Sequence, residues 1–410
     1  MVPDLARGLA LLGIAIANVA TAWLVAGLGT QLDSADYFGG VVDDSLADKF
    51  TVFFTAIAAH NRGLPMFSTL LGFGVGLIAL SLQRRGFTLR RNRAIVAKRY
   101  AYLALFGTLH MIFLFFGDIM FFYGICGVVL AALLDISDKT LKWLAGVPLA
   151  ITAVVGTLAA VAVNFTDSNF LTAGFGKSEF FAESLVQPQS YLDLVASNAL
   201  VWVLGIFGLP MTTFLYLPLM LIGFRWARAG VLTDVAAHKK TLLAWATAAV
   251  VISVGIGVPW GYAAIHGSAG LDSTGWLLLN SSLGVFTGPG ILAALALLAA
   301  PLQRRVSAGE PVPGVLTPII ALGKRSMSGY VAQSILFAAV VYPFWGNFPQ
   351  GTGAATQTLL AIGVWLATVL AAWVLERLGK PGPLEHVHRR LAYGPTMRPE
   401  PGPPAPQVPA

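Results

Sequence analysis

The sequence predicts an all-α fold, a polytopic integral membrane helix bundle of about ten transmembrane helices with both termini in the cytoplasm. Two observations support this prediction. The chain is 56% hydrophobic and only 11% charged, with a mean hydropathy of +0.74, whereas soluble domains are about 25% charged. The segment 84–99 (RRGFTLRRNRAIVAKR) is rich in Arg and Lys, has no acidic residue and lies between two long apolar segments. Short basic loops of this kind are retained on the cytoplasmic side of a membrane.

About ten apolar segments are each long enough to cross a hydrocarbon core of roughly 30 Å. The first is longer than the apolar stretch of a signal peptide, so we interpret it as an uncleaved helix. The predicted spans are approximately 6–29, 63–83, 99–116, 119–134, 142–163, 198–224, 241–263, 275–300, 316–342 and 357–376.

Acidic and basic loops alternate along the chain, and this alternation sets the predicted orientation. The segment 30–50 carries several aspartates against a single Lys49, whereas 84–99 and the segments after the sixth, eighth and tenth spans are basic. This pattern places both termini in the cytoplasm. The net charge of +7 lies at segment ends and in loops, so it does not indicate a nucleic-acid partner. The Pro-rich segment 394–410 is expected to be a disordered cytoplasmic tail.

No sequence motif indicates a bound metal or cofactor. Cys126 is the single cysteine and lies in an apolar run, which excludes an internal disulfide and disfavours a thiolate metal site. The histidines form no H-x-x-x-H pair, and neither a nucleophile elbow nor a phosphate-binding P-loop occurs. His386 and His388 lie among basic residues and are interpreted as belonging to a membrane-surface segment.

The sixth predicted span contains Pro210 and Pro218, so a kinked or broken helix is expected there. Backbone groups freed at membrane depth must be covered by protein or line a cavity. A proline kink used only for helix packing and a functional interruption are both consistent with this pattern.

His110, Asp118 and Tyr123 are the candidate catalytic residues. Ionisable groups inside membrane spans are costly and are functional hypotheses by default. Two antiparallel helices joined at Gly117-Asp118 would bring these three side chains toward one pocket in the outer leaflet. A histidine oriented by a carboxylate is suited to act as a general base. The alternative is a neutral histidine bonded to a neighbouring helix, with Asp118 capping the next helix.

Two further groups are candidate donor- or substrate-binding residues. Arg7 and Asn18 lie eleven residues apart on the first span and are predicted to share one helix face. The run 323–334 (GKRSMSGYVAQS) places Lys324, Arg325, Ser326, Tyr330 and Gln333 at the start of the ninth span. Positive-inside anchoring by Arg7 and interhelical hydrogen bonding by the ninth span are the alternatives.

The sequence His60-Asn61-Arg62 lies at the outer start of the second span. Arginines at a membrane interface usually extend their charged end into water. We interpret His60 as a solvated interface residue.

Five motifs together resemble a known family. In chain order they are RGLALLGIAIAN at 7–18, FSTLLGFGVGL at 67–77, LHMIFLFFGDIMFFYGICG at 109–127, GKRSMSGYVAQS at 323–334 and GPLEHVHRRLAYG at 382–394. They resemble the YeiB-type proteins of the bacterial inner membrane, a family of unknown function. The resemblance implies one multi-pass domain over residues 1–393 in the bacterial plasma (inner) membrane. Its N-terminal region would cover residues 1–235, and its YeiB-like region would cover residues 236–393.

That family is distantly similar to a superfamily of transmembrane acyltransferases, which move an acyl group from cytosolic acyl-CoA to a sugar, glycan or lipid. Several members carry an arginine at the start of the first helix and a catalytic histidine eleven residues later. Arg7 matches this pattern, but Asn18 stands where the histidine is expected. Because an amide cannot act as a general base, the resemblance implies that another residue, such as His110, takes that role.

Three functional hypotheses follow. In a membrane acyltransferase, the basic segment with Arg90, Arg91, Arg93 and Arg99 would bind acyl-CoA phosphates, and Arg7 would help to hold the donor. His110 would then activate an envelope acceptor. In a transporter or lipid translocator, the sixth and ninth spans would line a path. In a scaffold, the basic loops would serve only topology and contact with membrane lipids. The sequence does not determine the oligomeric state.

Overall fold

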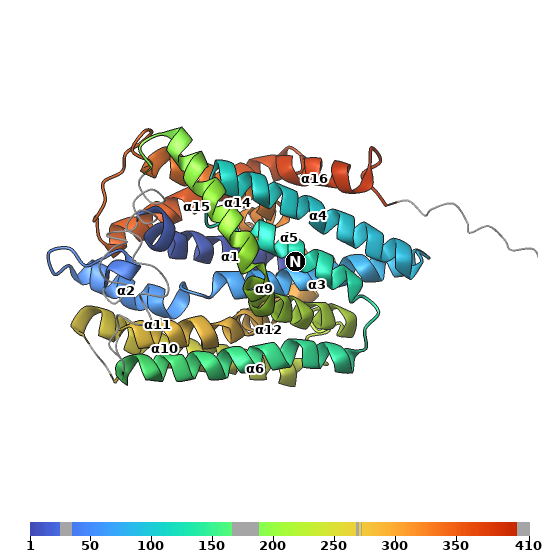
Figure 1. The fold of residues 1–410 in the computed structure, drawn as a ribbon. Helices are drawn as coiled ribbons and strands as arrows, with labels where there is room; N and C mark the ends of the chain where they lie inside the picture. The colour runs from blue at the N-terminus through green and yellow to red at the C-terminus, as the bar shows by residue number, and fades with distance from the viewer. Residues whose placement is uncertain (25–34, 166–187, 268–269, 272, 400–410) are drawn as a thin grey trace, which may run out of the picture.

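The computed structural model describes residues 1–24, 35–165, 188–267, 270–271 and 273–399. The regular elements in these ranges are helices, and the long ones lie side by side as a bundle (Figure 1). In chain order the α-helices are α1 (Val2–Asn18), α2 (Leu46–Ala58), α3 (Gly63–Arg84), α4 (Leu89–Phe113), α5 (Met120–Ala132), α6 (Asp138–Ala162), α9 (Tyr191–Ala229), α10 (Lys239–His266), α11 (Ser273–Leu283), α12 (Thr287–Ser307), α13 (Thr317–Lys324), α14 (Ser326–Val341), α15 (Ala354–Arg377) and α16 (Pro383–Tyr393).

The prediction of an all-helical membrane protein is confirmed. Within the described residues, seven helical stretches are long and apolar enough to cross a membrane. They are Val2–Trp23, Leu46–Arg84, Asp138–Ala162, Tyr191–Ala229, Lys239–His266, Ser273–Ser307 and Ala354–Arg377. The other predicted spans correspond to α4, whose first turns are rich in arginine, and to the shorter helices α5 and α14. The count of about ten spans and the orientation of the termini therefore stay predictions.

One helix was not predicted. The stretch Leu46–Arg84 has 39 residues, or about 58 Å of helix, nearly twice the thickness of a hydrocarbon core. It consists of α2 and α3, which are separated at residues 59–62, where Asn61 adopts a positive φ of 57°. α3 matches the predicted span 63–83, while α2 lies beyond it and packs against α10 and α15.

The sixth span was predicted to be kinked or broken; the break is wrong, and the kink stays a prediction. α9 continues as one helix through Pro210 and Pro218. Pro210 and Pro218 remove the amides that would bond the Ile206 and Phe214 carbonyls, and neighbouring helices and local adjustments can satisfy such groups in a membrane helix. Near Pro210, Thr212 Oγ1 donates to the Gly208 carbonyl at 3.1 Å.

The predicted ninth span is interrupted instead. α13 ends at Lys324 and α14 begins at Ser326, and Arg325 between them has φ −117° and ψ 32°. α13 packs against the first turns of α1 so closely that a Cβ at Gly323 would lie 1.7 Å from the Asp4 carbonyl oxygen. The residues 323–326 are thereby held against the start of α1.

The basic segment 84–99 is only partly a loop. Thr88 caps the N-terminus of α4 by accepting a hydrogen bond from the Arg91 amide at 3.3 Å. Residues from Arg90 onward therefore lie on the first turns of a helix.

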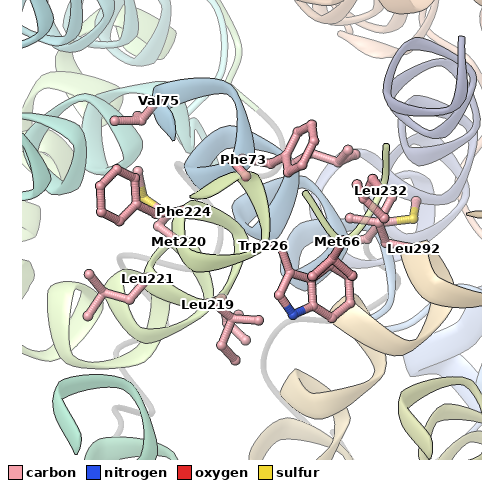
Figure 2. Close-up of a cluster of buried hydrophobic side chains, with 14 of the residues drawn as sticks. Met66, Phe73, Val75, Leu219, Met220, Leu221, Phe224, Trp226, Leu232 and Leu292 are labelled. Carbon is pink, nitrogen blue, oxygen red and sulfur yellow. The ribbon is translucent and has the colours of Figure 1, made fainter. Parts of the chain in front are cut away.

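The largest buried cluster lies where α3 and α9 cross (Figure 2). A Cβ at Gly72 would lie 1.9 Å from the Met220 carbonyl oxygen, and one at Gly223 would lie 1.9 Å from the Thr69 carbonyl oxygen. Small residues allow membrane helices to approach this closely. Around the contact, Figure 2 shows Met66, Phe73 and Val75 of α3 with Leu219, Met220, Leu221, Phe224 and Trp226 of α9.

Candidate functional site

A cavity of about 860 Å³ lies on the other side of α3 from this crossing. Its walls come from successive turns of several helices. The lining residues are Asp4, Arg7, Leu11 and Ile14 of α1, Phe67, Leu71, Gly74 and Ile78 of α3, Arg99, Tyr100 and Leu103 of α4, Met120 and Tyr123 of α5, Met327 and Tyr330 of α14, and residues of 323–326, 376–382 and α16.

One end of the cavity is polar and is called the rim here. Its cationic residues outnumber its acidic ones: Arg7, Arg99, Lys324, Arg325, Lys380 and Arg389 against Asp4, Glu376 and Glu385. Glu376 accepts from both Lys324 and Arg325, each at 2.6 Å. Asp4 pairs with Arg7 at 2.9 Å. Within the described residues, Arg99, Lys380 and Arg389 form no salt bridge, so the rim retains positive charge.

Arg325 has mainly a structural role. It is 6% exposed, and its guanidinium donates to the Lys380 carbonyl at 2.5 Å and to the Ala321 carbonyl at 3.2 Å. These bonds satisfy backbone oxygens next to the interruption between α13 and α14. Lys324 is more accessible, although it shares Glu376 with Arg325.

Glu385 of α16 caps the N-terminus of α14. Its Oε1 accepts from the amides of Met327 at 2.9 Å and Ser328 at 3.1 Å, and its Oε2 bonds the Ser328 hydroxyl. A carboxylate at a helix N-terminus satisfies free N–H groups and interacts favourably with the helix dipole. Gly382 must lack a side chain here, since its Cβ would lie 1.9 Å from Glu385 Oε2. The GPLE sequence at 382–385 thus joins α16 to the rim.

The opposite end of the cavity, called the depth here, is mostly apolar. Leu11, Ile14, Phe67 and Met120 line it together with the ring of Tyr123. The Tyr123 hydroxyl donates to the Leu64 carbonyl at 2.8 Å and accepts from the Ser68 hydroxyl at 2.9 Å. These bonds fix the ring, which stacks on Phe67 with a centroid distance of 6.0 Å.

His110 and Asp118 form a buried pair. His110 Nδ1 lies 2.7 Å from Asp118 Oδ2, and the side chains are 2% and 0% exposed. Asp118 Oδ1 accepts from the Phe121 amide at 2.8 Å. The carboxylate therefore orients the imidazole and also caps α5, which joins the two roles that the sequence presented as alternatives. His110 Nε2 is buried and has no hydrogen-bond partner among the described residues.

Tyr330 connects this pair to the cavity wall. The Tyr330 and His110 ring centroids are 5.2 Å apart, and Tyr330 lines the cavity whereas His110 does not. The predicted His110, Asp118 and Tyr123 group is thus divided: Tyr123 lies on the cavity wall, and the other two do not line the cavity.

The structure also separates the predicted binding residues. Arg7, Arg99, Lys324, Arg325, Ser326 and Tyr330 line the cavity. Arg93 turns away to Asp135 and the Ala132 carbonyl, and Arg90 and Arg91 are exposed on α4. Neither Asn18 nor Gln333 lines the cavity; the Gln333 amide is directed at the Leu11 carbonyl at 3.5 Å.

The interpretation of His60 as solvated is wrong. His60 is 3% exposed and Arg62 is 2% exposed. The His60 ring lies among Tyr37, Phe38 and Trp260, with centroid distances of 4.9 to 5.9 Å. Arg62 donates to the Ile57 carbonyl at 3.1 Å and thereby stabilises the C-terminal end of α2. Contacts with residues 37 and 38 and with α10, which the sequence did not predict, therefore bury the His60 ring.

Sequence reasoning missed four rim residues, Glu376, Lys380, Glu385 and Arg389, and interpreted α16 as a membrane-surface segment. For Glu385 and Arg389, the signal was the charged run in GPLEHVHRR at 382–390. His388 in this run is buried, and its Nε2 donates to the Arg99 carbonyl at 2.8 Å. Burial, followed by the nearby charge of Arg99, lowers the pKa of His388 to about 4.

Comparisons with known proteins identify relatives without an assigned activity. Residues 226–395 match the family model described as "Protein of unknown function (DUF418)". The chain is 23% identical over 408 residues to the "Uncharacterized protein YxaH" of Bacillus subtilis (strain 168). This alignment covers 95% of this chain and 93% of the relative. Both findings agree with the resemblance to YeiB-type membrane proteins of unknown function.

Proposed function

We propose that this protein is a membrane acyltransferase of the bacterial plasma (inner) membrane that takes its acyl group from a cytosolic acyl-CoA. The observation that carries the proposal is a cavity with a cationic rim and an apolar depth, one of whose lining residues, Tyr330, packs its ring against His110 of the buried His110 and Asp118 pair. An amphipathic anionic donor matches this distribution of charge and apolar surface.

The rim suits the phosphate groups of the donor. Arg99, Lys380 and Arg389 carry charge that no acidic side chain of the described residues neutralises. Guanidinium groups bind phosphate through charge-assisted hydrogen bonds. The acyl end would then extend past Arg7 into the apolar depth.

His110 would serve as the general base for the acceptor. With Nδ1–H donated to Asp118, Nε2 has a free lone pair that can take a proton from an acceptor hydroxyl or amine. The acceptor atom attacks the thioester carbonyl and forms the new acyl bond, the C–S bond breaks, and CoA leaves as its thiol after protonation. Because His110 does not line the cavity and the neighbouring Tyr330 ring does, Tyr330 would have to move for this contact.

The first experiment measures binding of an acyl-CoA to the purified protein in lipid nanodiscs, together with release of CoA. The double variant Lys380→Gln/Arg389→Gln should weaken binding at least about tenfold, because both side chains line the rim. The matched control Arg90→Gln/Arg91→Gln removes two exposed charges from α4 and should leave binding unchanged. Equal losses in the two double variants would contradict a rim site, and substrate flux without an acyl donor would favour transport.

A further inference from the structure

The sequence Gly72-Phe73-Gly74-Val75-Gly76 in α3 places glycines on two opposite sides of one helix. Gly72 and Gly76 are explained by packing against α9: a Cβ at Gly72 would lie 1.9 Å from the Met220 carbonyl oxygen, and one at Gly76 would lie 2.4 Å from the Ala227 side chain. Helix–helix contact of this kind leaves no room for side chains.

Gly74 is not explained by helix packing. It lies on the cavity face of α3 with Phe67, Leu71 and Ile78. A Cβ at Gly74 would meet only one atom within 4 Å, Arg7 Nη2 at 3.4 Å. The missing side chain therefore leaves space inside the cavity, directly opposite the Arg7 guanidinium.

This position lies at the inner edge of the rim, where the rim meets the depth of the cavity. On α1, Asp4 lies toward the rim from Arg7, whereas Leu11 and Ile14 lie in the depth. On α3, Leu71 and Phe67 continue from Gly74 into the depth. A ligand that extends from the rim into the depth passes this level of the cavity, where Arg7 of α1 and Gly74 of α3 both line the wall.

We propose that Arg7 and Gly74 form the neck of the cavity, and that the absent side chain at position 74 admits the chain of an acyl donor from the rim into the depth. The inference rests on the proposed function, because it takes an acyl-CoA as the ligand. It makes Gly74 a specificity-determining residue: ligands that occupy only the rim do not depend on it, and ligands that extend into the depth do.

The side-chain size at position 74 should set how much of the donor enters. Alanine places its Cβ 3.4 Å from Arg7 Nη2, which is ordinary van der Waals contact, so Gly74→Ala should bind like the wild type. Gly74→Val adds two methyl groups beyond this Cβ, and they must either fill the neck or displace Arg7.

The test compares two probes on the full-length protein in nanodiscs. Octanoyl-CoA reaches the depth, and adenosine 3′,5′-bisphosphate carries the phosphate groups without the chain. Gly74→Val should weaken the affinity for octanoyl-CoA at least about tenfold and change the affinity for the bisphosphate less than about twofold. The matched control is Gly255→Val on α10, where a Cβ has nothing within 4 Å, and it should change neither probe.

Equal octanoyl-CoA affinity in Gly74→Val and wild type would contradict the assignment of Arg7 and Gly74 as the neck. Loss of both probes together would also overturn it, because position 74 would then act through Arg7 or the fold. A wild type that binds neither probe would overturn the proposed function itself, which is a distinct result. Should Gly74→Val fail to fold, Gly74→Cys can be alkylated after folding, since the native Cys126 is buried; alkylation must then reduce octanoyl-CoA binding selectively.

Discussion

His110 and His60 are almost equally buried, at 4% and 3% exposed, but their surroundings differ. His110 is bonded to Asp118 beside a cavity, and its Nε2 has no partner among the described residues. His60 is enclosed by aromatic rings next to Arg62. The comparison teaches that burial alone does not distinguish a candidate catalytic histidine from a packing residue. The chemical partner and the neighbouring cavity do.

The largest expected effect tests this comparison directly. His110→Ala should lower acyl transfer by about 10²- to 10⁴-fold, because a general base is removed, while acyl-CoA binding persists. His60→Phe is the matched variant, since it replaces one buried ring by another among Tyr37, Phe38 and Trp260, and it should keep full activity. Release of CoA and donor affinity are measured for both. Normal turnover in His110→Ala would contradict the role of His110 as the general base.

Asp118→Asn tests whether the carboxylate acts through the tautomer of His110 or only by capping α5. The amide oxygen can still accept from the Phe121 amide, so α5 keeps its cap. The amide N–H then faces His110 Nδ1 and favours the tautomer with the proton on Nε2. Because Nε2 is then already protonated, it cannot accept a proton from the acceptor. Most of the transfer activity should disappear without a change in melting temperature. If transfer activity and melting temperature fell in proportion, Asp118 would have only a structural role.

Glu385→Ala extends the comparison to a partly buried carboxylate contact. It leaves the Met327 and Ser328 amides at the start of α14 without their acceptor. We expect the free energy of unfolding to fall by about 1–3 kcal/mol. The control Glu310→Ala removes an exposed ion pair with Arg305 and should cost less than about 1 kcal/mol. Equal destabilisation in denaturant titrations would argue against a capping role.

His388 should give a smaller effect that depends on pH. Its pKa in the folded state is lowered to about 4 from 6.5, so the unfolded chain binds a proton below pH 6.5 that the folded chain does not. The free energy of unfolding therefore falls as pH decreases from about 6.5 to about 4, by up to about 1.4 kcal/mol per pH unit. The variant His388→Gln should flatten this slope in stability measurements between pH 4 and 7. An unchanged slope would contradict the burial of a neutral His388.

Some features of the site were predictable because the residues are near one another in sequence. His110 and Asp118 lie eight residues apart across a tight turn, so two antiparallel helices bring them together. The lining residues Arg7, Lys324, Arg325 and Tyr330 were named because polar groups inside or beside a membrane span are unusual. The rim residues of α16 were missed because their placement depends on a contact between Glu385 and α14, which is distant in sequence.

The basic segment 84–99 shows where sequence patterning misleads. Its charge is informative for topology, but the same charge predicted a phosphate site at Arg90, Arg91 and Arg93, which lie away from the cavity. Only Arg99, further along α4, reaches the rim. Helical periodicity separates these side chains onto different faces, and the face that points to the cavity depends on how α4 packs.

The sequence by itself determined that this chain is a helical membrane protein and where most of its helices lie, because apolar length and loop charge act locally. The tertiary structure decided which polar residues share a cavity, that α9 is continuous, that the ninth span is interrupted at Arg325, and that Gly74 faces Arg7 while its neighbouring glycines face α9. These properties depend on helix contacts between distant segments, which composition and periodicity do not encode.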